Sequence, residues 1–175
     1  MVDGQRTECD MFPLSGFYHF GIVVSDFDKS LEELSNNLGI EWASVTEFEI
    51  ECEQPNGIVT ADMKVVYSTT GPPHFEVIRV APGTVWGQAD QGVHHLGYWT
   101  ENLQEDHKRL TDAGYVWEST YRNPDTEGPY GFTYHTLKET GIRVELVDLA
   151  RKPAFDNWMA GGEFPSAMDP GGMQN

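Results

Sequence analysis

Two short motifs occur twice along the chain, and this repeat limits the possible folds more than any other feature of the sequence. The segment HFGI at positions 19–22 resembles HLGY at positions 95–98, and apolar residues at helical spacing follow each of them. Further along each half, FEVI at positions 75–78 resembles VELV at positions 144–147. Two matches in the same order indicate one structural unit used twice, because internal repeats reflect repeated supersecondary structure.

The order of predicted elements is also the same in the two halves. In the first half we expect strands at 16–24, 41–52, 58–69 and 74–80, and a helix that starts after Asp26 and ends at Gly39. In the second half we expect strands at 93–100, 115–121, 131–138 and 142–148, and a helix at 102–113 that ends before Gly114. Each half is therefore predicted to be a strand, a helix and three further strands.

The repeat also sets the predicted division of the chain. We assign residues 1–15 to a polar leader, 16–81 to the first module, 82–91 to a linker, 92–148 to the second module and 149–175 to a C-terminal extension. The linker is predicted from Pro82, Gly83 and Gly87, which interrupt regular structure. Within the extension, 153–159 is predicted to be a short helix that packs on the rest of the protein.

The chain is strongly acidic, which excludes several classes of partner. Its 175 residues include 11 Lys and Arg against 28 Asp and Glu, a formal net charge of −17 at pH 7. Such a charge repels nucleic acids and anionic membrane surfaces but attracts metal cations, so we expect neither nucleic acid nor a membrane as partner. The two cysteines, Cys9 and Cys52, suggest no disulfide framework, and without a long apolar run they indicate a cytoplasmic protein.

Four residues at equivalent positions of the repeat are candidate metal ligands. His19 and His95 lie in the first predicted strand of each half, and Glu76 and Glu145 lie in the last. A carboxylate in the middle of an apolar strand is costly unless it is paired, protonated or bound to a metal. A single strand His or Glu is more often exposed or hydrogen-bonded, but the repeat favours ligation by all four. Nitrogen and oxygen donors suit one divalent ion of zinc, iron, manganese, cobalt or nickel and do not identify it.

Together with the helices that follow them, the segments HFGIVVSD at 19–26 and GVHHLG at 92–97 resemble those of the vicinal oxygen chelate superfamily. This superfamily includes glyoxalase I, methylmalonyl-CoA epimerase, fosfomycin-resistance enzymes and extradiol dioxygenases, and the resemblance covers residues 17–148. It implies an α+β fold in which two βαβββ modules form an open, mostly antiparallel half-barrel around a metal site. The ligands that it implies are His19, Glu76, His95 and Glu145.

The resemblance also implies a catalytic base. In related isomerases a glutamate at or beside the metal removes a proton from the substrate, so Glu145 or Glu76 is the expected base here. Glu47, Glu49 and Glu51 share one face of a predicted strand and are a second choice, with a solvated strand face as the simpler interpretation.

Four further residues are candidates for contact with the substrate. His74 and Arg143 each lie two residues before a candidate glutamate and therefore share its face of the strand. Trp99 and Tyr134 are candidates to wall the cavity, although aromatic residues in strands are more often plain core.

Three other histidines are not expected in the site. His94 is expected to point away from His95, because neighbouring residues of a strand alternate between its two faces. His107 falls on a charged helical stretch that is predicted to be a solvated face, and His135 is predicted to be structural or exposed.

The expected function is that of a metal-dependent isomerase or lyase acting on a small carbonyl compound through a metal-stabilised enolate. Two alternatives are open at this point: an iron-dependent oxygenase of the same fold, and a non-catalytic protein that binds a small molecule. Members of the superfamily often pair, so a homodimer is expected.

Overall fold

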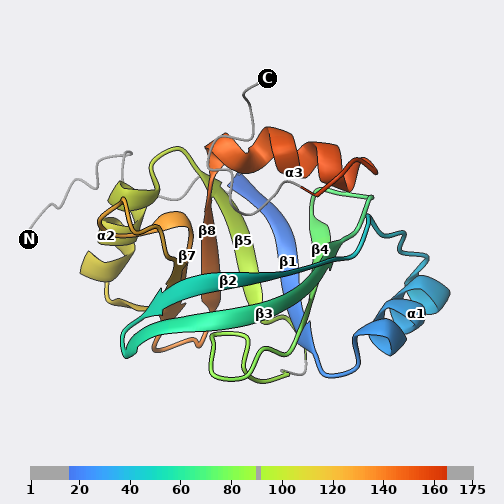
Figure 1. Cartoon of the computed structure of the whole chain (residues 1–175), viewed down its shortest axis with the longest axis horizontal. Helices are drawn as coiled ribbons and strands as arrows, with labels where there is room; N and C mark the ends of the chain where they lie inside the picture. Colours follow the sequence, from blue (N-terminus) through green and yellow to red (C-terminus); the bar gives the residue numbers. More distant parts are fainter. Residues whose placement is uncertain (1–15, 90–91, 165–175) are drawn as a thin grey trace, which may run out of the picture.

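The computed structural model describes residues 16–89 and 92–164 (Figure 1). The predicted leader 1–15, residues 90–91 of the predicted linker and residues 165–175 of the predicted extension lie outside the described residues. Within the described part of the chain, no helix has the length and apolar character needed to cross a membrane.

The two halves have the same order of elements. The first half contains β1 (Phe17–Val24), α1 (Phe27–Leu38), β2 (Thr46–Gln54), β3 (Gly57–Tyr67) and β4 (His74–Arg79). The second half contains β5 (His95–Thr100), α2 (Leu103–Asp112), β6 (Tyr115–Tyr121), β7 (Tyr130–Leu137) and β8 (Arg143–Asp148), after which a 3-10 turn, η3 (Leu149–Arg151), leads into α3 (Lys152–Met159). The predicted strands and helices are confirmed, and the largest difference is the start of β2.

β2 begins later than predicted because the segment before it is drawn toward α1. Trp42 forms only an isolated bridge with Ser68. Its indole N–H donates a hydrogen bond to the Ser35 hydroxyl of α1, 2.8 Å away. Continuous pairing of β2 with β3 starts at Thr46, opposite Val65.

The helix ends follow from local sequence. The Asp26 carboxylate accepts a hydrogen bond from the Lys29 backbone N–H at 3.2 Å, and Gly39 ends α1 in the left-handed region at a φ of 68°. The Asn102 side chain accepts from the Glu105 backbone N–H at 3.2 Å at the start of α2. Side-chain acceptors at the first position and glycine after the last are strong helix signals, which is why these bounds were predictable.

The eight strands form one mixed sheet in the order β1-β4-β3-β2-β6-β7-β8-β5. The pairs β1–β4 and β5–β8 are parallel, and the other neighbours are antiparallel. Figure 1 shows α1 and α2 outside the strands at opposite sides of the molecule, and α3 across the top of the strands.

The prediction of an open half-barrel is wrong, because the sheet closes on itself. The halves are joined between β1 and β5 and again between β2 and β6, where Cys52 lies opposite Tyr121 and Glu53 opposite Thr120. An open sheet would leave a row of unpaired backbone groups along its edge, and the second junction pairs part of that edge.

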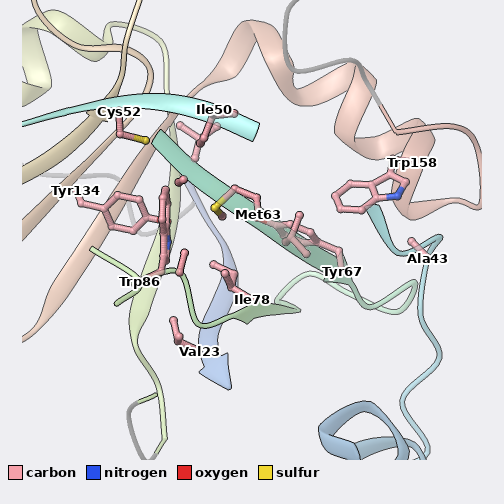
Figure 2. Close-up of a cluster of buried hydrophobic side chains, with 14 of the residues drawn as sticks. Val23, Ala43, Ile50, Cys52, Met63, Tyr67, Ile78, Trp86, Tyr134 and Trp158 are labelled. Atoms are coloured by element: carbon pink, nitrogen blue, oxygen red, sulfur yellow. The ribbon is translucent and has the colours of Figure 1, made fainter. Parts of the chain in front are cut away.

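Apolar side chains fill the interior of the barrel, and Figure 2 shows part of this cluster. Smaller clusters lie outside it, where α1 packs over Val77 and α2 packs over Leu146. Neighbouring residues such as Val77 and Ile78 therefore face different layers, as strand alternation requires. The interior cluster includes Val23, Ile50, Met63, Tyr67, Ile78, Trp86, Tyr134 and Trp158.

The predicted helix at 153–159 is confirmed, and it contributes to the core. Trp158 of α3 is fully buried, and its indole N–H donates to the Ser44 carbonyl oxygen at 2.9 Å. Its ring packs edge-on against Tyr67, with centroids 5.3 Å apart. Phe155 also contacts Tyr67, at 5.9 Å between centroids. The helix thus packs directly on the aromatic layer inside the barrel.

Removing the Trp158 side chain should show that α3 belongs to the core. Trp158→Ala would leave a cavity beside Tyr67, so we expect the free energy of unfolding to fall by about 3–5 kcal/mol. Urea denaturation followed by circular dichroism measures this change. Leu38→Ala, at a residue that is 64% exposed, should change stability by no more than about 0.5 kcal/mol. Equal effects of the two substitutions would contradict the assignment.

Candidate metal centre

Four adjacent strands, β4, β1, β5 and β8, carry the candidate metal ligands. One comes from each strand: His19 from β1, Glu76 from β4, His95 from β5 and Glu145 from β8. Parallel pairing within each half and antiparallel pairing between β1 and β5 bring the four side chains together. Residues that are far apart in the sequence therefore meet at one place.

The donor atoms of these side chains form a compact group. The Nε2 atoms of His19 and His95 are 2.9 Å apart. The Oε2 atom of Glu76 lies 3.0 Å from Nε2 of His95 and 3.4 Å from Nε2 of His19. The Oε2 atom of Glu145 lies 3.2 Å from Nε2 of His19 and 3.5 Å from Nε2 of His95. Ligand atoms ~2.1 Å from one metal ion are ~3.0 Å apart at right angles and ~3.4 Å apart at tetrahedral angles, so the spacing fits a coordination group.

The burial of this group points to a cation. The exposed fraction of the surface is 0% for His19, 1% for His95, 7% for Glu76 and 6% for Glu145. The Oε2 atoms of both glutamates are buried and accept no hydrogen bond from the described residues. Each of them lies within ion-pair distance of a histidine. Buried carboxylate oxygens need such a partner or a positive charge. The group could therefore hold a metal ion.

The same contacts shift the pKa values of the group. Burial alone lowers the pKa of His19, but Glu76 and Glu145 outweigh burial and raise that pKa to about 9. Burial also lowers the pKa of His95, but the two glutamates outweigh burial and raise that pKa above its ordinary value. Burial favours a higher pKa for both glutamates, but the histidines hold both pKa values below their usual range. A metal ion bound through the Nε2 atoms would displace any hydrogen that they carry.

The glycine two residues after each histidine makes room for the histidine of the other half. In the β1–β5 pair, Gly21 lies opposite His95 and Gly97 lies opposite His19. A β-carbon at Gly21 would overlap the ring of His95, and one at Gly97 would overlap the ring of His19. Neither glycine has a positive φ. The repeated His-x-Gly pattern therefore reflects reciprocal packing and not a special backbone conformation.

Two buried tyrosines lie opposite the glutamates in the sheet. Tyr67 on β3 lies opposite Glu76, and Tyr134 on β7 lies opposite Glu145. Both tyrosines are buried, and the two carboxylates are close enough to them to influence their pKa values. Burial, with added repulsion from the carboxylates, raises the pKa of both tyrosines well above the ordinary value, so both remain neutral donors. Tyr134 was predicted to contact substrate, whereas Tyr67 was not singled out although it lies on the equivalent strand.

The other predicted substrate contacts are not part of the group of four candidate ligands. His74 is buried, and its Nδ1 atom lies 2.8 Å from the Ser68 carbonyl oxygen. Arg143 forms an ion pair with Glu118 at 2.6 Å. Trp99 stacks on an aromatic ring of β1 with centroids 3.9 Å apart. Their contact with a substrate stays a prediction.

His94 does not lie as predicted. Its ring is buried, and its Nδ1 atom lies 3.0 Å from the Nδ1 atom of His95. β5 begins at His95, so strand alternation does not govern the residue before it. The two neighbouring histidines are therefore in contact, and the expected opposite orientation is wrong.

The remaining candidates lie away from the ligands. Glu47, Glu49 and Glu51 are exposed on β2, as expected for a solvated strand face. His135 is fully buried, and its Nε2 atom lies 3.0 Å from the Nδ1 atom of His107 on α2. His107 is only partly exposed, so its predicted place on a solvated face is correct only in part.

Comparison with known proteins agrees with this architecture. The sequence profile of the Glyoxalase/Bleomycin resistance protein/Dioxygenase superfamily matches residues 18–134. A comparison with the sequences of curated proteins finds no match.

Several solved structures share the fold. Methylmalonyl-CoA epimerase from Mycobacterium tuberculosis is similar over 83% of this chain and 97% of its own, at 18% identity and a TM-score of 0.53. A hypothetical protein from Bacillus halodurans C-125 is similar over 75% of this chain and 92% of its own, at 13% identity and a TM-score of 0.54. A variant of Streptomyces coelicolor methylmalonyl-CoA epimerase in complex with 2-nitronate-propionyl-CoA is similar over 75% of this chain and 92% of its own, at 20% identity and a TM-score of 0.50. At these identities the similarity concerns the fold alone.

Replacing Gly97 by alanine should damage the metal centre more than the fold. The added methyl group would overlap the His19 ring and force it out of the group. We expect metal affinity to fall about tenfold or more, measured by competition with a chromophoric chelator. Leu96→Ala, which changes the opposite face of the same strand, should retain the affinity. An unchanged affinity in Gly97→Ala would show that His19 is not needed where the structure places it.

Proposed function

Because the chain belongs to the glyoxalase/bleomycin resistance protein/dioxygenase superfamily, we propose that it is a metal-dependent isomerase or lyase that acts on a small carbonyl compound. The observation that carries this proposal is the buried group of His19, Glu76, His95 and Glu145. Four ionisable side chains in a barrel interior are costly for a purely structural role, and the spacing of their donor atoms suits a metal ion.

A bound divalent ion would act as a Lewis acid, polarising a substrate carbonyl oxygen and acidifying the adjacent carbon. His19, His95, Glu76 and Glu145 are the proposed ligands. Four protein donors leave positions on a six-coordinate ion for a substrate, and the donor set suits zinc, iron, manganese, cobalt or nickel without selecting one.

Glu145 is the proposed base for the proton on that carbon, with Glu76 as the equivalent residue of the other half. Both carboxylates point at the ligand histidines, so either lies within reach of a substrate held at the same centre. Tyr67 lies opposite Glu76 and Tyr134 lies opposite Glu145, so both carboxylates are enclosed, and a buried base held in place needs little solvent reorganisation. Return of the proton to another face or carbon gives an isomerase, and loss of an adjacent leaving group gives a lyase.

The proposed substrate is an uncharged or weakly anionic carbonyl compound. The net charge of −17 provides no long-range attraction for a phosphate-rich molecule. One structure that shares the fold is methylmalonyl-CoA epimerase in complex with methylmalonyl-CoA, so coenzyme A thioesters are the comparison class for any substrate panel. Further substrate contacts are proposed for His74 on β4, Trp99 on β5, Tyr134 on β7 and Arg143 on β8.

The donor set also supports a second function. Two histidines and one carboxylate facing open coordination positions are typical of non-haem iron oxygenases. His19 and His95 with either glutamate supply such a set. For an oxygenase, removal of oxygen should abolish turnover, whereas an isomerase or lyase should be unaffected.

The proposal includes the division of the chain into two related modules, 16–81 and 92–148, joined by the linker 82–91. The shared order of elements and the equivalent positions of the ligand candidates support this division. Formation of a homodimer and a cytoplasmic location stay predictions.

Metal analysis of tag-free protein tests the proposed ligands. Plasma mass spectrometry should find about one divalent ion per chain, and His19→Ala, Glu76→Ala, His95→Ala and Glu145→Ala should each lose it. Glu49→Ala removes an exposed acid of β2 and should retain the ion. Metal-free parent protein that takes up no metal would reject the catalytic proposal and favour a non-catalytic binding protein.

Deuterium exchange at the substrate carbon tests the base. Metal-loaded parent protein in D2O should exchange a carbon-bound proton of a substrate found in a panel of small carbonyl compounds and coenzyme A thioesters, followed by NMR. Substituting the base, as Glu145→Gln or Glu76→Gln, should slow exchange by about 100- to 10,000-fold, because an amide does not accept the proton. Glu49→Gln is the matched control. No exchange with any compound would reject the isomerase assignment.

A further inference from the structure

The segment between β4 and β5 reaches the metal centre through His94. The Nε2 atom of His94 lies 3.1 Å from the Val85 carbonyl oxygen, and its Nδ1 atom lies 3.0 Å from the Nδ1 atom of His95. The His94 ring is buried. A row of hydrogen-bonding atoms therefore runs from the backbone of the linker through two imidazole rings to the Nε2 atom of His95.

The chemistry of these atoms assigns the proton positions. A backbone carbonyl oxygen only accepts hydrogen bonds, so Nε2 of His94 carries a hydrogen. The Nδ1 atom of a neutral His94 is then an acceptor, and it accepts the hydrogen on Nδ1 of His95. The lone pair of His95 is left on Nε2, the atom that lies 3.0 Å from Glu76 and 2.9 Å from Nε2 of His19. This is the tautomer that coordination through Nε2 requires.

The ligands of the two halves differ in this support. Nδ1 of His19 is buried and forms no hydrogen bond with the described residues. In the second half, the Trp86 indole N–H donates to the Tyr134 hydroxyl at 3.3 Å, and Tyr134 lies opposite Glu145 in the sheet. Two adjacent residues between β4 and β5 thus bind neighbours of the second-half ligands: Val85 binds His94, and Trp86 binds Tyr134.

We infer that His94 is a positioning residue, anchored on the Val85 carbonyl, that sets the tautomer and ring orientation of His95 as a metal ligand. This inference rests on the proposed metal site. Before a metal binds, the hydrogen bond from His95 to His94 favours the tautomer of His95 with its hydrogen on Nδ1. It also favours one orientation of the His95 ring. Loss of such a partner typically weakens metal affinity by about 10- to 100-fold.

Two substitutions separate positioning from packing. His94→Leu removes both hydrogen bonds, whereas His94→Gln offers an amide that can donate to Val85 and accept from His95. We expect His94→Leu to weaken Zn²⁺ and Co²⁺ binding by about 10- to 100-fold in competition with a chromophoric chelator, and His94→Gln to restore most of that affinity. His135→Leu removes another fully buried histidine, away from the metal centre, and should bind as the parent does.

Spectroscopy gives a readout that packing alone would not change. In zinc-loaded protein with nitrogen-15 histidine, NMR should show a scalar coupling between the Nδ1 atoms of His94 and His95 across their hydrogen bond. The absorption bands of bound Co²⁺ should shift in His94→Leu and return toward those of the parent in His94→Gln.

The outcomes distinguish this inference from the proposed metal site. If the parent binds metal and His94→Leu has the same affinity and the same Co²⁺ spectrum, the role of His94 is overturned and the proposed metal site stands. A hydrogen on Nδ1 of His94 in the zinc-loaded protein would overturn it as well. A parent that binds neither Zn²⁺ nor Co²⁺ would reject the proposed metal site and the inference with it.

Discussion

The antiparallel pairing of β1 with β5 is the contact on which the candidate metal centre depends. It joins the two halves, and it sets Gly21 opposite His95 and Gly97 opposite His19. Each imidazole occupies the space that the opposing glycine leaves, which brings the two Nε2 atoms to 2.9 Å from each other. The same strand pairing therefore joins the halves and brings the candidate ligands together. A side chain at either glycine would disturb the strand pairing and the position of the opposing histidine.

The halves are equivalent in element order but have different surroundings. In the second half, hydrogen bonds connect His95 through His94 to Val85, and Trp86 donates to Tyr134, which lies opposite Glu145. In the first half, Tyr67 lies opposite Glu76 and packs against Trp158 of α3. The two glutamates therefore have unlike environments, and unlike environments are what separate the chemical roles of paired carboxylates.

Much of this architecture could be predicted from the sequence because it depends on local order. Apolar spacing, the Asp26 cap and the Gly39 stop predicted the elements, since these signals act within a few residues. The repeat placed two histidines and two glutamates at equivalent positions, and the structure brings those four together. The start of β2 was missed because a distant contact, the hydrogen bond of Trp42 to α1, overrides the strand pattern.

By itself, the sequence determined the repeated order of elements, the inward faces of the strands and the four candidate ligands, all of which follow from alternation and spacing along the chain. Only the tertiary structure decided that the sheet closes at Cys52 and Tyr121, that Tyr67 faces Glu76, and that His94 turns toward His95. Strand partners are chosen by packing between distant segments, and alternation no longer applies where a strand ends. A single sequence carries no local signal for strand partners or for the orientation of a residue at a strand end. The positions of Tyr67 and His94 beside the candidate metal centre therefore follow only from the tertiary structure.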